Sequence, residues 1–448
     1  MQEARIFHHA LKVDEELCYG CTRCMSVCPT TAIRIRRGKA VVDPARCIDC
    51  GNCMEACPVD AIVVEQDDFQ KIFRYAYRVA VVPSVMIGQF KEEISESRVI
   101  NAIHELGFTH VYEAEFGTDI LHRISGAYPI YAAKGPIISS FCPAIVQLVQ
   151  VRFPSLVSHL NLIKPPLDIS AHFAQRELIK QGARQEEIGI FYVTPCAAKI
   201  AAIKSPAEEE SGLFNGVINM NFLFNLVRKT LVRQKKTASI PKPDRSRISP
   251  AAVTWSLTNG EAPHMKGRSL SVDGIHNVIE FLEKLESGEI TGIDFLELRS
   301  CDEGCAGGIL GSGNRFLTAE RLRHRADSMK ALDPQVLKRV DAQEDYLSRH
   351  IKLAQIRPRS IVKLDDDFQQ AMRKMERIQE LLGSLPRVDC GVCGSPSCEA
   401  LAQDIVQGRG ELNQCIFYQR SQEVLDPLRS KRNLEHMRRI WGSGKFSI

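Results

Sequence analysis

The chain has 448 residues, of which 44% are hydrophobic, and its formal net charge at pH 7 is +4. A chain of this length is expected to hold roughly two to four domains, and so small a charge does not indicate nucleic-acid or membrane binding. No apolar run approaches the roughly 18 residues of a membrane-spanning helix, and no signal-peptide pattern opens the chain. We therefore expect a cytoplasmic protein whose grouped cysteines hold metal rather than form disulfides.

Two cysteine runs near the N-terminus repeat one pattern, C-x-x-C-x-x-C-x-x-x-C-P, with a period of 29 residues. A 4Fe–4S cube needs four thiolates; the tight loop supplies three, and the fourth cysteine of each run ligates the other cube. The pattern predicts one cluster on Cys18, Cys21, Cys24 and Cys57, and a second on Cys47, Cys50, Cys53 and Cys28. Zinc sites and disulfides are the alternatives, which this duplicated spacing disfavours.

Residues 1–68 are predicted to form this two-cluster, ferredoxin-like domain. From 69 to 330, apolar strand patterns alternate with amphipathic helices, which predicts an α/β domain built on parallel sheets. The short strands expected in the first domain are 9–13, 40–43 and 61–64; in the second we expect strands at 78–82, 110–114, 137–140 and 188–193, and helices at 91–106 and 144–153. The basic, proline-broken stretch 228–250 is interpreted as a surface loop rather than a nucleic-acid site.

Four cysteines of the second domain are expected in turns at the carboxyl ends of strands. A lone cysteine is most often an inert core residue, but turns at the carboxyl ends of strands are where α/β sheets bind ligands. These cysteines are Cys142, Cys196, Cys301 and Cys305, and their small neighbours are Ala197, Ala198, Gly304, Gly307 and Gly308. Such small residues let backbone N–H groups approach sulfur and a bulky inorganic ligand.

The segments around these cysteines carry a family resemblance. SSFCPA, PCAAK and CDEGCAGG, in this order behind a two-cluster unit, resemble the three signature segments of the iron-only (FeFe) hydrogenases. RVAVVPSVMIGQF and AIHELGFTHVYEAEFGTDI are similar to the first core strands and helix of that family. The resemblance covers roughly residues 8–320. It implies an α/β multidomain protein with a two-lobed hydrogenase domain and a cluster between the lobes.

The resemblance also implies a cofactor and site residues. Cys142, Cys196, Cys301 and Cys305 would hold a 4Fe–4S cube, and Cys305 would bridge it to a diiron subsite that carries CO, cyanide and a dithiolate amine. Lys199 would donate a charge-assisted hydrogen bond to a cyanide, and Pro195, Gly304 and Gly307 would line the cofactor. The implied substrates are hydrogen and protons, and the implied partner is an electron-transfer or signalling protein.

The chain departs from the family at every position of the expected proton relay. Phe141 stands where catalytic members carry a cysteine, and Ala202 stands where they carry a glutamate. An acidic pair is replaced by Ile124 and Ser125, and a methionine of the third segment by Arg299, before a shortened glycine run at 307–309. Because turnover needs a proton carrier within hydrogen-bond reach of the reacting atoms, the resemblance is to the sensory branch of the family.

The C-terminal third carries a fourth cysteine set. Residues 331–384 are charge-rich and predicted to be a helical extension, and residues 420–448 are a basic helical tail. Between them, residues 385–419 hold Cys390, Cys393, Cys398 and Cys415, and a helix is expected from 398 to 407. This module resembles small 4Fe–4S modules found in corrinoid-protein and sensor contexts. Zinc remains the alternative ligand, because four-cysteine spacing alone does not select iron.

Three functions fit these observations. The first is a hydrogen-sensing regulatory hydrogenase with slow turnover, which passes electrons through its clusters to a partner. The second is a catalytic hydrogenase with a different proton path. The third is a non-enzymatic iron–sulfur electron-transfer protein that lacks the diiron subsite.

Overall fold

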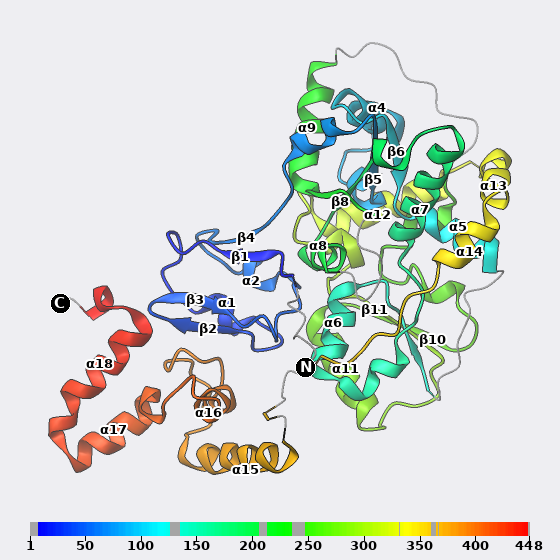
Figure 1. Ribbon diagram of the computed structural model, residues 1–448. Coiled ribbons are helices and arrows are strands. Elements are labelled where there is room, and N and C mark those ends of the chain that lie inside the picture. Colours follow the sequence, from blue (N-terminus) through cyan, green and yellow to red (C-terminus); the bar gives the residue numbers. More distant parts are fainter. Residues whose placement is uncertain are drawn as a thin grey trace. The chain divides into compact units, whose positions relative to one another are not determined.

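The computed structural model describes residues 8–125, 135–205, 213–234, 247–330, 332–359, 364–365 and 367–446. The chain divides into two compact units, one of residues 1–64 and 359–448 and the other of residues 65–358. Figure 1 shows the helices and strands of both. Within the described ranges, no helix combines the length and the apolar character that crossing a bilayer requires.

Among its described residues, the larger unit contains two parallel sheets, as the alternation of strand and helix patterns predicted. One sheet has the order β6-β5-β8-β9 and the other has the order β10-β11-β7, and every pairing is parallel. Their strands are β5 (Tyr77–Val82), β6 (His110–Glu113), β7 (Ile137–Ile138), β8 (Ile188–Thr194), β9 (Gly216–Asn219), β10 (Ser269–Val272) and β11 (Phe295–Leu298). Strands β9 and β10 were not predicted, and β11 is the strand expected before Cys301, for which the sequence pattern predicted no bounds.

The helices of the larger unit (Figure 1) are α3 (Ser84–Gly88), α4 (Glu96–Glu105), α5 (Phe116–Ser125), α6 (Pro143–Arg152), α7 (Pro166–Lys180), α8 (Ala197–Lys204), α9 (Met220–Arg233), α10 (Pro250–Thr254), α11 (Ile275–Glu286), α12 (Arg315–Asp327), α13 (Pro334–Asp341) and α14 (Glu344–His350). Helices α4, α7, α8 and α9 pack against the four-stranded sheet. Strand β8 is buried along its whole length, as expected for a central strand of a covered parallel sheet. Alternate residues such as Ile190 and Tyr192 join the core beneath α7, whereas Phe191 packs with Phe108 and Tyr75.

One prediction for this unit needs correction, and another lies partly outside the described residues. The helix expected at 91–106 begins only at Glu96, because residues 91–94 form a turn closed by the Ile94 N–H to Lys91 carbonyl bond of 2.9 Å, and Ser95 is extended. The predicted basic loop begins inside α9, and its central part, 235–246, lies outside the described residues.

The smaller unit begins with the two cysteine repeats. Strand β1 (Leu11–Val13) pairs with β4 (Ile62–Val64), and β2 (Ile33–Arg36) pairs with β3 (Lys39–Val42), both antiparallel. Each cysteine loop leads into a single helical turn, α1 (Arg23–Ser26) or α2 (Asn52–Glu55). The β2–β3 turn has positive φ at Arg37 and Gly38, which is the two-residue hairpin geometry that matches strand twist.

The C-terminal part of the smaller unit is helical. Its helices are α15 (Phe368–Ser384), α16 (Cys398–Val406), α17 (Ile416–Leu425) and α18 (Ser430–Trp441). A small core joins α15 to the cysteines of this region, with Ile378, Leu381 and Leu401 buried around Cys398 and Cys415. Of the predicted helical extension, α13 and α14 belong to the larger unit and α15 to the smaller.

Candidate metal centres

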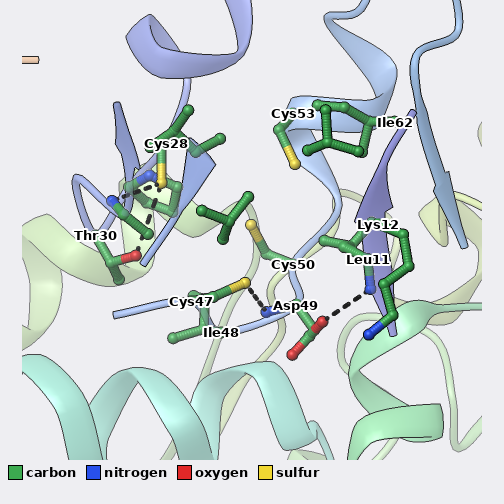
Figure 2. Close-up of a pocket in the computed structure, with 15 residues that line it drawn as sticks. Leu11, Lys12, Cys28, Thr30, Cys47, Ile48, Asp49, Cys50, Cys53 and Ile62 are labelled. Carbon is green, nitrogen blue, oxygen red and sulfur yellow. Dashed lines mark hydrogen bonds between the residues drawn. The ribbon is translucent and has the colours of Figure 1, made fainter. Parts of the chain in front are cut away.

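The second predicted cysteine set lines one cavity. Figure 2 shows Cys47, Cys50 and Cys53 from one loop with Cys28 from the other repeat, among apolar side chains such as Leu11. Burial raises the pKa of the Cys50 thiol to about 12. Buried thiols that are hard to ionise alone suit a site where a metal supplies positive charge.

The first predicted set is also brought together. Burial, and then the charges of Cys18, Cys21 and Cys57, raise the pKa of Cys24 to about 12. Backbone amides point at sulfurs in both sets: the Ala32 N–H donates to Cys28 Sγ at 3.2 Å, and the Ala61 N–H donates to Cys57 Sγ at 3.2 Å. The two fourth cysteines thus have the same environment, and N–H donors of this kind favour thiolate and tune a bound cluster.

The C-terminal set lines a second cavity, formed by Cys390, Cys393, Cys398 and Cys415 with neighbouring residues. Cys390 is exposed and the other three are buried, and burial raises the pKa of Cys393 to about 11. Gly391 and Gly394 have positive φ, which bends the loop around the cavity. Cys398 opens α16, and its N–H donates to Asp389 at 2.7 Å.

The third set is assembled from both sheets of the larger unit. Cys142 follows β7 and precedes α6, Cys196 follows β8 and precedes α8, and Cys301 and Cys305 follow β11. The charges of Cys142 and Cys305 both act on Cys196, after burial, to raise its pKa to about 12. Cys301 stands in the same turn as Cys305, bonded through its carbonyl to the Gly304 N–H at 3.1 Å.

The glycines of this turn, and Pro195 in the turn that follows β8, lie close to neighbouring backbone groups. A Cβ on Gly304, whose φ is +61°, would lie 2.4 Å from the Ser256 carbonyl oxygen, and one on Gly307 would lie 2.2 Å from the Asp302 carbonyl oxygen. The Pro195 carbonyl accepts the Leu310 N–H at 3.0 Å, which joins the second and third signature segments. Close backbone packing thus accounts for the two glycines.

Lys199 is a buried cation at this site, 4% exposed. Its Nζ donates to Cys305 Sγ at 3.6 Å. Burial by itself lowers the pKa of Lys199, but the neighbouring Cys305, Tyr192 and Cys196 raise it well above its usual value. An ammonium group has three donors, so this buried charge suits an anionic acceptor beside Cys305.

Phe141 lies between two cations. Lys199 Nζ is 4.7 Å from the centroid of its ring, and Arg299 Cζ is 4.1 Å from it. Both are within the range of a cation–π interaction. The ring is 6% exposed and directly precedes Cys142. The position expected for a proton-relay cysteine therefore carries a buried hydrocarbon ring.

Arg299 belongs to a buried charge network. Its Nε is 3.2 Å from Glu297 Oε1, and its Nη2 is 3.2 Å from Glu261 Oε2, while Ser139 Oγ donates to the same Glu261 oxygen at 2.6 Å. Burial lowers the pKa of Arg299, but Glu297 and Glu261 outweigh this and raise it. Among the described residues, Nη1 has no hydrogen-bond partner. Sequence reasoning identified Arg299 but missed Glu297, whose signal was an acid inside the apolar strand FLEL.

A second polar network begins at Glu115, which is 2% exposed and whose charge acts on Lys199. Glu115 Oε2 accepts the Ser84 N–H at 2.8 Å and the Ser84 hydroxyl at 3.0 Å, and that hydroxyl is also 3.1 Å from Glu113 Oε2. Arg325 binds both Glu113 oxygens at 2.8 and 2.9 Å and pairs at 2.7 Å with Glu96, whose side chain is 36% exposed. These groups link the neighbourhood of Lys199 to solvent.

Profiles of known families match three parts of the chain. Residues 76–262 match the family described as "Iron only hydrogenase large subunit, C-terminal domain". Residues 10–58 match the "4Fe-4S dicluster domain", and residues 385–417 match a family described as "Putative Fe-S cluster".

Two curated proteins are similar in sequence. The periplasmic Fe hydrogenase large subunit of Nitratidesulfovibrio vulgaris is 28% identical over 228 residues, which are 46% of this chain and 54% of that protein. Iron hydrogenase 1 of Clostridium pasteurianum is 25% identical over 203 residues, which are 41% of this chain and 34% of that protein. The chain thus spans about half or less of the curated relatives that it matches.

Solved structures of the FeFe-hydrogenase HydA1 from Chlamydomonas reinhardtii are also similar; one variant has a TM-score of 0.47 and 14% identity, over 62% of this chain and 94% of that chain. The hydrogenase profile spans Cys142 and Cys196 and ends before Cys301 and Cys305, and the dicluster profile spans the paired cysteine repeats. Residues 76–262 are therefore similar to the C-terminal domain of iron-only hydrogenase large subunits, and residues 10–58 are similar to 4Fe–4S dicluster domains.

Proposed function

We propose that this protein is a hydrogen-responsive regulatory hydrogenase of the cytoplasm. It interconverts hydrogen with two protons and two electrons slowly, and passes the electrons through 4Fe–4S clusters to an electron-transfer or signalling partner. Phe141 carries this proposal, because a phenyl ring beside Cys142, flanked by Lys199 and Arg299, has no proton to exchange.

The cysteine groups fit four clusters. The two sets of the repeats, the set of Cys142, Cys196, Cys301 and Cys305, and the C-terminal set would each hold one 4Fe–4S cube. When bound, a diiron subsite on Cys305 supplies the centre at which hydrogen reacts. Zinc at the C-terminal cysteines is excluded by this proposal, because a redox-inert ion there could not exchange electrons with a partner.

The polar groups beside Cys305 fit an anionic ligand. Lys199 has donors to spare, and Arg299 Nη1 has no partner among the residues that the structure describes. Buried cations of this kind are costly unless they are paired. Lys199 would therefore orient a cyanide of the diiron subsite, and the Arg299 charge would add to the positive field around it.

Slow turnover follows from the lining of the site. A positioned proton carrier contributes about 10²–10⁴-fold to a rate, and Phe141 and Ala202 supply none. Hydrogen could still bind and change the redox state of the clusters. That change, rather than a flux of product, is what a partner would detect.

Infrared spectroscopy tests the proposal. The protein is co-expressed with the diiron maturation machinery, purified without oxygen, and measured before and after exposure to hydrogen. We expect terminal CO and cyanide bands that shift with hydrogen, together with a low rate of hydrogen evolution. Protein with iron for four cubes but without these bands would instead be a non-enzymatic iron–sulfur protein.

The contacts of Glu115 favour a second candidate, a working hydrogenase with another proton path. The chain Glu115–Ser84–Glu113–Arg325–Glu96 reaches solvent, and burial raises the pKa of Glu115, which favours a protonated carboxyl able to donate. In a working hydrogenase, Glu115→Gln would lower turnover at least about tenfold. In the regulatory protein it would leave the slow rate unchanged. The exposed Glu283→Gln is a matched control.

A further inference from the structure

A buried ion cluster joins the C-terminal cysteine module to the first cysteine repeat within the smaller unit. Asp404 of α16 is 3% exposed and accepts from two arginines of β2. Arg34 Nε donates to its Oδ2 at 2.7 Å, and Arg36 Nη2 donates to the same oxygen at 3.0 Å. The Ser395 hydroxyl of the cysteine loop adds a third donor at 3.2 Å. A buried carboxylate with this many donors fixes one docking geometry.

Backbone bonds continue the joint along the β2–β3 hairpin. The Arg37 and Gly38 N–H groups donate to the Arg439 and Ile440 carbonyls at 3.1 and 2.7 Å. These carbonyls end α18 and would otherwise lack partners within the helix. The Trp441 indole N–H then donates to the Val392 carbonyl at 3.0 Å. The basic terminal helix α18 is thus hydrogen-bonded both to the hairpin and to the C-terminal cysteine loop.

The same loop is attached directly to β2. The Gly394 carbonyl accepts the Ile35 N–H at 2.8 Å and Arg36 Nη1 at 2.8 Å. A Cβ on Gly394 would lie 2.4 Å from the Ile35 carbonyl oxygen, so the loop and the strand touch backbone to backbone. Residues 392–394 are thus held at two points, between Cys390 and Cys398.

This docking brings two cysteine loops into contact. Met25 directly follows Cys24, and its Cε would be 3.0 Å from a Cβ placed on Gly391, which directly follows Cys390. One methionine side chain therefore spans the gap between the two loops. Arg36 also lies near enough to Cys393 for their charges to interact. A cation beside those thiolates favours the more negative, reduced state of a cluster that they hold.

We propose that the docked C-terminal module is an internal electron acceptor for the cluster of Cys18, Cys21, Cys24 and Cys57, across the Met25–Gly391 contact. One electron leaves that cluster, which is oxidised by one, and the C-terminal cluster is reduced by one, with no proton or further reactant. The inference rests on the iron–sulfur part of the proposed function and needs no diiron subsite. It places the C-terminal module, rather than the second repeat, at the partner's end of the path.

Electron paramagnetic resonance of the full, chemically reduced protein tests this inference. We expect broadening and fast relaxation from magnetic interaction between the C-terminal cluster and one repeat cluster. Cys393→Ser should remove the C-terminal signal and sharpen the signal of that repeat cluster. Wild-type protein in which the C-terminal signal shows no interaction would overturn the inference, as would zinc at these cysteines.

A docking variant sharpens the test. Asp404→Asn leaves Arg34 and Arg36 without their shared anion, so the interaction should be lost while iron content stays at four clusters. Asp341→Asn, which removes an exposed pair with Arg123 in the larger unit, should leave the interaction unchanged. An Asp404→Asn protein that is undocked, shown by faster proteolysis after residue 359, yet keeps the interaction would contradict the inference. None of these readouts requires hydrogen, so the infrared test can fail independently.

Discussion

The paired cysteine loops and the site at Cys305 both present cysteine thiols, but the groups that surround those thiols differ. In the loops, the thiols face apolar side chains and backbone N–H groups, as at Cys28 and Cys57. At the other site the thiols face two buried cations, Lys199 and Arg299. A cluster that only carries electrons needs gentle tuning by amide dipoles. Under the proposed function, a centre with anionic ligands would need fixed positive charge, and Lys199 and Arg299 would supply it.

The largest expected effects come from substituting a cysteine in each region, and the two substitutions should change different spectroscopic signals. Cys305→Ala should abolish the CO and cyanide infrared bands, because it removes the proposed bridge to the diiron subsite. Cys50→Ala should leave those bands and instead remove one cluster signal in paramagnetic resonance. Bands that survive Cys305→Ala, or vanish with Cys50→Ala, would show that the two regions are not separate in this way.

The buried charge network gives the next effect. Glu297 is fully buried, pairs with Arg299, and accepts the N–H groups of Glu261 and Ala262 at 2.9 and 2.7 Å. Glu297→Gln should lower the free energy of unfolding by about 3–5 kcal/mol, because it leaves a buried cation short of its anion.

Urea unfolding of the purified protein measures this effect. The exposed pair of Arg152 and Glu283 is the control, and Glu283→Gln should change the free energy of unfolding by less than about 1 kcal/mol. Equal effects of the two substitutions would contradict the account of the network.

Phe141→Cys is expected to raise the rate of hydrogen evolution. A thiol at this position restores a proton carrier beside Cys142, so hydrogen evolution by matured protein should rise about tenfold or more. Phe153→Cys, at the far end of α6, changes the same residue type in the core and should leave the rate unchanged. An unaltered rate in Phe141→Cys would place the limit on turnover elsewhere, for example at the Glu115 network.

The smallest expected effect is on the pH dependence of the free energy of unfolding. Burial raises the pKa of Glu261 to about 7, above its ordinary value of 4.5. The folded protein then binds more protons than the unfolded chain between these values, so this group lowers stability as pH rises from about 4.5 to 7. Glu261→Gln should flatten that fall in a series of unfolding curves. A steeper fall in the variant would mean that the sign of the shift is wrong.

The sequence predicted what is encoded locally. The cysteine repeats can be recognised from short spacings in the sequence, and β5 and β8 are predicted by their continuous apolar runs. Strand β10, SLSV, and strand β9, GVIN, have no such pattern, and become strands because parallel neighbours pair with them. Likewise, no local signal links Arg34 to Asp404 or Arg299 to Glu261, because those partners meet only through the tertiary fold.

The most direct test of the central claim is the infrared spectrum of matured, oxygen-free protein with and without hydrogen, combined with a rate assay on the same sample. The account predicts CO and cyanide bands that shift with hydrogen while turnover stays slow. Rapid turnover would contradict the regulatory function, and the absence of bands from protein with all four clusters would contradict the diiron subsite itself.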